Sequence, residues 1–135
     1  MAKSNAAKLA EFHAAMGEDV DIPPNLPAAE IVKLRQTLIR EEFAEVMAEL
    51  EQLQAAQGEG KTADFVPLMH ELADLLYVTY GTFVAFGVNA DAVFAEVHRA
   101  NMQKLSGPRR ADGKLLKPPN WQPANVRGVI EQMKG

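Results

Sequence analysis

The chain has 135 residues, 47% of them hydrophobic and 24% charged, which is typical of one globular domain over 1–135 and too short for two. It contains no cysteine, which excludes disulfides, cysteine zinc sites and a thiol nucleophile. A net charge of −4 argues against general nucleic-acid binding, and no uncharged run reaches the roughly 20 residues of a membrane helix. We therefore expect a cytoplasmic protein that binds neither nucleic acid nor a membrane.

Helix breakers divide the chain into five helical segments. Gly17 ends the first segment, and three prolines make 18–27 a loop. Two glycines between 57 and 61 separate the second segment from the third. No segment alternates with period two, so the sequence predicts an all-α fold. The predicted helices, in chain order, are 5–16, 28–56, a helix to Phe86 capped by Thr62 or Asp64, a helix to Leu105 capped by Asn89 or Asp91, and 126–133.

The third predicted helix is apolar around most of its circumference. Leu68, Val78, Phe83 and Val84 lie on different sides of it. A helix that is apolar on all sides is buried on several sides, and a chain of this length can scarcely surround it. We therefore expect part of this helix to pack against a second copy in a homodimer or a higher oligomer. The alternative is a helix central to a monomeric bundle.

Carboxylates interrupt the apolar stripe of the second helix. At about 100° per residue, Glu42 and Glu45 fall close to the line of Leu34 and Leu38, which should face the core. Ionised carboxylates that are buried together cost several kcal/mol each, and carboxylates one turn apart repel each other. A bound divalent cation is the simplest compensation. Glu41 lies at the flank of this stripe.

The third helix repeats the anomaly with Glu71 and Asp74, one turn apart. Asp74 is the only charged residue between 72 and 90, so it is expected to be paired, protonated or bound to a metal. Carboxylate-rich, oxygen-only ligands suit Mg²⁺ or Mn²⁺, and facing helices of a bundle build such sites in their cores. A di-iron site would need Glu-x-x-His, which is absent here. The alternative for each acidic pair is a solvated helix face.

A basic segment follows the acidic centre. Six bases lie between 99 and 117, and basic side chains bind phosphate oxygens well. The acids would hold a cation and the bases the phosphates of its ligand; the alternatives are a solvated basic loop and internal salt bridges. Trp121, nearby, either stacks on a base or anchors the tail. The candidate substrate-binding residues are Asn101, Lys104, Arg109, Arg110, Asp112, Lys114 and Lys117, with Tyr77 of the third helix, whose hydroxyl is expected to reach a polar cavity.

These residues resemble a known family. Glu41-Glu42-x-x-Glu45 followed by Glu71-x-x-Asp74 is similar to the motif of the MazG-like, all-α nucleoside triphosphate pyrophosphatases. The segments LRQTLIREEFAEV, HELADLLYVTYGT, VFAEVHRANMQKL and PRRADGKLLKPPNW resemble the members that act on dUTP. The resemblance covers about 12–133.

The resemblance implies a four-helix core with an N-terminal helix, a loop-rich C-terminal arm and a short last helix, assembled as a dimer. It implies hydrolysis of dUTP or a related nucleotide to monophosphate and pyrophosphate with more than one Mg²⁺ or Mn²⁺. Glu42, Glu45, Glu71 and Asp74 would be ligands. Glu41 would be the catalytic base for water or a further ligand. Asn101 and Lys104 would contact the nucleotide, and the arm from Arg109 to Lys117 its phosphates.

Three alternatives remain open on the sequence alone. The substrate could be phosphoribosyl-ATP or another non-canonical nucleotide. The protein could bind a metal–nucleotide complex without turnover. It could also be a structural helical dimer whose acids pair with the basic arm. Base selectivity depends on pocket shape and a few hydrogen bonds, which the sequence does not give.

Overall fold

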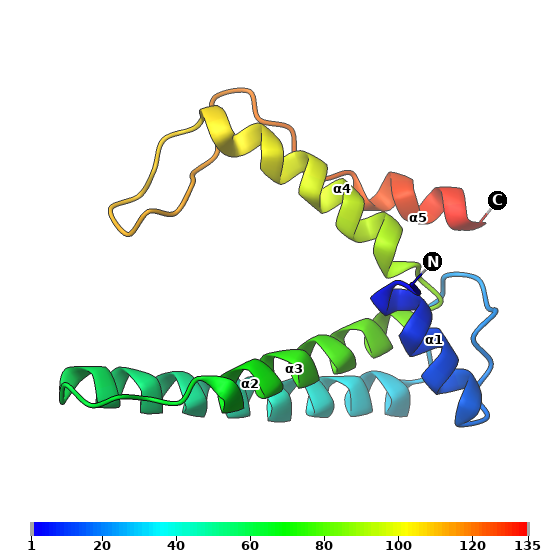
Figure 1. Ribbon diagram of the computed structural model, residues 1–135. Coiled ribbons are helices and arrows are strands. Elements are labelled where there is room, and N and C mark those ends of the chain that lie inside the picture. Colours follow the sequence, from blue (N-terminus) through cyan, green and yellow to red (C-terminus); the bar gives the residue numbers. More distant parts are fainter. Residues whose placement is uncertain (1, 135) are drawn as a thin grey trace.

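The computed structural model describes residues 2–134, and every regular element within them is helical (Figure 1). The all-α prediction is confirmed. None of these helices alone is long and apolar enough to cross a membrane, and residues 66–85 with 90–106 pass that test only as a pair of helices bent by 113°. The elements are α1 (Asn5–Ala15), α2 (Ala29–Gly58), α3 (Val66–Ala85), α4 (Ala90–Met102), the 3-10 turn η1 (Gln103–Ser106) and α5 (Val126–Lys134).

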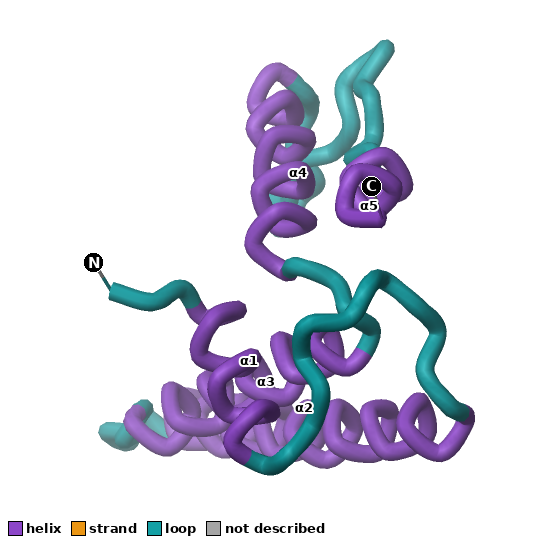
Figure 2. Tube along the Cα trace, turned by 90° about the vertical axis from the view of Figure 1, so that its right-hand side faces the viewer, coloured by secondary structure: helices purple, strands orange, loops and turns teal. Residues whose placement is uncertain are grey.

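The helices form two arms joined at one end. α2 and α3 lie along each other, and α1 packs against α3 (Figure 1). α4 turns away from that pair, and α5 lies alongside α4, as the side view also shows (Figure 2). Within residues 2–134, α2 and α4 make no contact with each other. One chain therefore has the shape of an open V, with α3 and α4 meeting at the hinge.

The helix ends follow local signals, and several differ from the predicted bounds by one to three residues. α4 ends at Met102, and the predicted continuation to Leu105 forms the 3-10 turn η1 instead. α2 continues past residue 56 to Gly58, because the left-handed residue that ends it is Gly60 (φ 68°). Lys61 N–H donates to Ala56 O over 2.9 Å and Gly60 N–H to Gln57 O over 3.1 Å, the pattern of a Schellman cap. α3 begins at Val66, whose N–H donates to the Asp64 carboxylate over 3.0 Å. Asp64 therefore stabilises a turn that precedes the helix.

One chain buries little of its apolar surface. Among residues 2–134, six apolar residues are buried, whereas eighteen large apolar side chains are exposed. The exposed set includes Phe43 on α2 and Phe94 on α4, at 53% and 65% exposure. The buried apolar residues are Leu9, Val46, Leu68, Ala90, Val93 and Ala100.

A buried polar joint fixes α1, α2 and α3 together. Arg35 of α2 is only 9% exposed; its Nε donates to Thr82 Oγ1 over 3.0 Å and its Nη2 to Val78 O over 2.7 Å. Both acceptors lie on α3. His13 of α1 is buried next to the same point of α3, at Gly81, which has no side chain to keep the helices apart. A glycine inside a helix is destabilising by itself, so close packing explains its presence here.

Gly81→Ala is therefore expected to lower the free energy of unfolding by about 1–3 kcal/mol. A Cβ there would lie 2.6 Å from Arg35 Nη2 and 3.0 Å from His13 Nε2, so the guanidinium would have to move from its two acceptors. Urea denaturation followed by circular dichroism measures the change. Gly58→Ala is the control, because nothing lies within 4 Å of its added methyl group. Equal loss in both variants would contradict the packing argument.

Candidate active site

Three carboxylates come together where α2 and α3 pack. Glu42 and Glu45 are one turn apart on α2, and Glu71 approaches them from α3. One oxygen from each carboxylate lies within 4.8 Å of those from the other two. Glu42 and Glu71 are half-buried and Glu45 is exposed. The packing of the two helices thus collects three of the five acids in the Glu-Glu-x-x-Glu and Glu-x-x-Asp patterns.

The other two acids lie beside this cluster. The pKa of Glu42 is raised first by burial and by Glu45, and then by the charges of Asp74 and Glu41. Asp74 is partly exposed, with its Oδ2 3.4 Å from Nε2 of His70 on the preceding turn. Glu41 is exposed at the flank of α2. Both are close enough to add charge to the site, and their roles as ligand or base stay predictions.

The cluster carries more negative charge than the surrounding protein satisfies. Burial and the neighbouring Glu45 raise the pKa of Glu42, while a hydrogen bond to Glu45 and then burial raise the pKa of Glu71. Oε2 of Glu42 and Oε2 of Glu71 are buried without a hydrogen-bond partner in residues 2–134. Buried polar atoms are normally satisfied, and hard divalent cations accept several carboxylate oxygens. These residues therefore fit Mg²⁺ or Mn²⁺.

The stability of the metal-free protein is expected to fall as the pH rises. The pKa values of Glu42 and Glu71 are raised above the ordinary value of 4.5. Their contribution is fully present below that value and is lost as the pH rises through the raised pKa values. A bound cation favours the ionised carboxylates, so Mg²⁺ should remove this loss. The melting temperatures in EDTA and in Mg²⁺ should therefore differ more as the pH rises. A difference between the two melting temperatures that does not change with pH would contradict the assignment.

The basic segment forms an ordered hairpin between 108 and 116. Leu116 N–H donates to Pro108 O and Arg110 N–H to Lys114 O, over 2.8 and 2.7 Å. Gly113, with φ 94°, closes the tip by donating its N–H to Arg110 O. The sequence predicts a loop here, and the backbone pairing gives that loop a defined shape.

Two hairpin residues that the sequence assigns to substrate are paired with each other. The Arg110 guanidinium donates to both carboxylate oxygens of Asp112, over 2.9 and 2.6 Å. This contact, followed by the Lys114 N–H, lowers the pKa of Asp112. Arg109 donates to Gly113 O over 3.3 Å. Asp112 therefore shapes the hairpin tip, and Lys114 has an exposed side chain.

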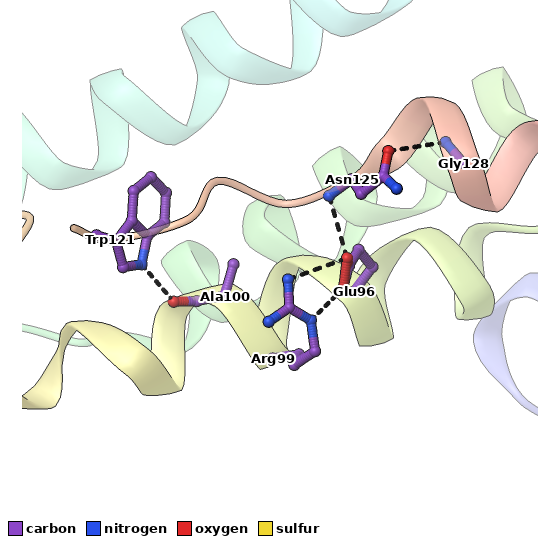
Figure 3. Close-up of polar contacts among 6 residues, drawn as sticks. All are labelled: Glu96, Arg99, Ala100, Trp121, Asn125 and Gly128. Atoms are coloured by element: carbon purple, nitrogen blue, oxygen red, sulfur yellow. Dashed lines mark hydrogen bonds and ion pairs between the residues drawn. The ribbon is translucent and has the colours of Figure 1, made fainter.

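Two lysines meet at the ring of Trp121. The Nζ atoms of Lys104, in η1, and Lys117 lie 4.9 and 5.2 Å from the ring centroid. The indole N–H donates to Ala100 O of α4 over 2.8 Å (Figure 3). Trp121 therefore anchors the C-terminal arm, as one of its two sequence interpretations predicts. Asn101, on the same turn of α4, is exposed.

Tyr77 lies apart from the acidic cluster's three carboxylates. Its ring packs edge-on against Phe12 of α1, with centroids 5.4 Å apart, and the residue is exposed rather than buried. The expected position of its hydroxyl at a polar cavity stays a prediction. Its contact with substrate stays a prediction.

A polar contact that the sequence did not reveal holds the arm along α4. Glu96 accepts hydrogen bonds from the Arg99 guanidinium and from Asn125 N–H, the latter over 3.0 Å (Figure 3). These contacts, that of Arg99 first, lower the pKa of Glu96. Asn125 in turn caps α5 by accepting from Gly128 N–H over 3.0 Å. A Glu-x-x-Arg pair on a helix normally indicates a solvated surface, so nothing in the sequence marks this junction.

The acidic cluster belongs to the α2–α3 half of the V, whereas the basic residues belong to the other half, with α4 and α5. Figure 1 shows the hairpin beyond the end of α4, across the opening from α2 and α3. Since α2 and α4 are not in contact, the two halves of the predicted site do not meet within one described chain. Bringing them together requires a second copy or closure of the arms.

The fold and the acidic cluster define a MazG-like, all-α nucleoside triphosphate pyrophosphatase. A family profile described as phosphoribosyl-ATP pyrophosphohydrolase matches residues 9–101, and the chain belongs to this family. It is therefore a pyrophosphohydrolase-type protein of a family that depends on divalent metals. The match spans the acidic cluster and ends before the basic hairpin. No curated protein matches the chain.

Proposed function

We propose that the protein hydrolyses dUTP or a related deoxynucleoside triphosphate to the monophosphate and pyrophosphate, and so removes it from the nucleotide pool. The observation that carries this proposal is the cluster of Glu42, Glu45 and Glu71, with two buried oxygens that lack partners. Preference for dUTP is supported by the segments around these acids and by PRRADGKLLKPPNW, which resemble dUTP-hydrolysing members of the superfamily.

In the proposed mechanism the five acids have two kinds of role, as metal ligands and as a base. Glu42, Glu45, Glu71 and Asp74 hold the divalent ions, which when bound neutralise phosphate charge and lower the pKa of water. Glu41, exposed at the edge of the cluster, accepts the proton of the attacking water or binds a further ion. Basic side chains of the arm bind the phosphates and stabilise the charge that develops on the departing pyrophosphate.

Phosphoribosyl-ATP is the second candidate substrate, because the matching family profile carries that description. Both reactions release pyrophosphate, so the acidic cluster serves either. The difference lies in the part of the substrate beyond the phosphates. A binding module that holds a metal–nucleotide complex without turnover is the non-enzymatic alternative.

A substrate panel separates these possibilities. Purified protein with Mg²⁺ is incubated with dUTP, the other deoxynucleoside triphosphates, UTP and phosphoribosyl-ATP, and released pyrophosphate is measured. We expect the highest kcat/KM with dUTP. A higher kcat/KM with phosphoribosyl-ATP would identify that compound, and not dUTP, as the substrate. Saturable nucleotide binding without pyrophosphate release would instead support the binding module.

We also propose that the working form is a homodimer. The uncovered apolar side chains lie on both arms, including Phe43 and Met47 of α2 and Phe94 and Val97 of α4. An apolar cavity of about 280 Å³ lies between the arms, lined by residues such as Phe86 and Ile130. A second copy related by a two-fold axis can present its α4 arm to the α2–α3 arm of the first, and reciprocally. Such an arrangement would also bring basic arms towards acidic clusters.

A further inference from the structure

The C-terminal arm is attached to α4 by a turn that presents one indole ring. The backbone N–H of Trp121 donates to Pro118 O over 3.2 Å, and Asn120 between them has a φ of 64°. Proline in the second position and a left-handed Asn in the third are typical of a type II turn. A positive φ outside glycine is uncommon and is kept where the surrounding structure requires it. Here it directs the Trp121 side chain onto α4.

The indole is held at both its polar and its apolar parts. Its N–H donates to the carbonyl of Ala100, a residue only 2% exposed in the last turn of α4, where carbonyls lack full helical partners. Its ring is half-buried between α4 and the arm. The ring position is therefore fixed relative to η1, which directly follows α4.

Two positive charges meet at this fixed ring. The Nζ atoms of Lys104 and Lys117 both lie within the range of a cation–π contact, so they are at most about 10 Å apart although the two lysines are thirteen positions apart in the sequence. Within residues 2–134, neither lysine forms an ion pair, whereas Arg99 and Arg110 are paired with Glu96 and Asp112. The two ammonium groups repel each other, and an anion that contacts both would reduce that repulsion.

We propose that Trp121 is a positioning residue that holds Lys104 and Lys117 together as a binding site for the pyrophosphate part of the nucleotide. This inference rests on the proposed function for the identity of the anion. The ring, through its negative face, sets where the two ammonium groups stand before the anion arrives, and a pre-positioned pair binds more tightly than two mobile side chains. The ring itself need not touch the phosphates.

Trp121 is the only tryptophan of the chain, so its fluorescence reports on this site without any turnover. Inorganic pyrophosphate is titrated into the intact protein with Mg²⁺. We expect a saturable change in emission, with the half-saturating concentration raised at least fivefold in Lys104→Gln and in Lys117→Gln. Lys61→Gln, at the exposed α2–α3 turn, is the matched control and should behave as the wild type. No response in the wild type, or unchanged half-saturation in both lysine variants, would overturn the proposal.

The role of the ring itself is tested by calorimetric titration with pyrophosphate. Trp121→Leu should weaken binding at least fivefold, and Trp121→Phe, which keeps an aromatic face but loses the N–H donor, should weaken it less. In a Lys104→Gln, Lys117→Gln background, Trp121→Leu should have no further effect, since the ring acts through the lysines. An equal loss in both backgrounds would show that Trp121 acts only on the fold. Neither titration requires hydrolysis. Absence of turnover would therefore refute the proposed function without deciding whether the two lysines and Trp121 bind pyrophosphate.

Discussion

Glu45→Gln is expected to reduce nucleotide hydrolysis by about a thousandfold or more, since it removes the carboxylate shared by both halves of the cluster. Glu45 lies within 4.8 Å of Glu42 and Glu71 and contributes to raising the pKa of both. Its replacement by an uncharged amide lowers the repulsion in the metal-free protein. The same variant should therefore melt at a higher temperature than the wild type in EDTA.

The loss of activity combined with gained metal-free stability distinguishes a metal ligand from a structural residue. Pyrophosphate release measures the first effect, and thermal melting in EDTA and in Mg²⁺ measures the second. Mg²⁺ should stabilise the wild type more than the variant. Glu51→Gln, an exposed acid on the same helix, is the matched control and should change neither quantity. An active Glu45→Gln, or one that melts lower in EDTA, would contradict the site.

Phe43→Asp is expected to convert the proposed dimer to a monomer and to lower activity as the fraction of dimer falls. Phe43 is 53% exposed in one chain and lines an apolar groove on α2 together with Val32 and Ile39. An uncompensated charge buried in an interface costs about 3–5 kcal/mol, enough to weaken association by two orders of magnitude or more. Sedimentation velocity over a range of protein concentrations measures the change.

The matched control for this prediction is Gln52→Asp. It adds the same charge to the same helix nine residues further on, at an exposed polar position on the face of the helix opposite Phe43. It should leave the association unchanged. A wild type that sediments as a monomer at micromolar concentration, or a Phe43→Asp variant that remains dimeric, would show that the apolar groove is not the interface.

The fold was predictable because its signals are local. Helix breakers and caps such as Gly17, Asn89 and the Gly58–Gly60 pair act within a few residues of the chain, and the structure places helix ends within a few residues of them. The start of α3 was less predictable, because Thr62 and Asp64 both offer caps and the helix begins after either. The buried Arg35 was missed, since an arginine on an amphipathic helix normally indicates a solvated face.

The acidic part of the site was predictable from helical spacing, because acids in an apolar stripe must face a neighbouring helix. The basic part was not. Which arginine is free and which is paired depends on the hairpin, where Arg110 reaches Asp112 only once the Gly113 turn has formed. The meeting of Lys104 and Lys117 at Trp121 likewise depends on how the arm folds back on α4, which no helical period predicts.

The reaction proposed for the acidic cluster cleaves a nucleoside triphosphate between its α- and β-phosphates. Phosphorus-31 NMR of dUTP incubated with the protein and Mg²⁺ tests it most directly. We expect the three triphosphate signals to be replaced by those of dUMP and pyrophosphate in equal amounts, and we expect EDTA to stop the conversion. The appearance of dUDP with orthophosphate would contradict it, as would an unchanged spectrum for dUTP and for every other nucleotide of the panel.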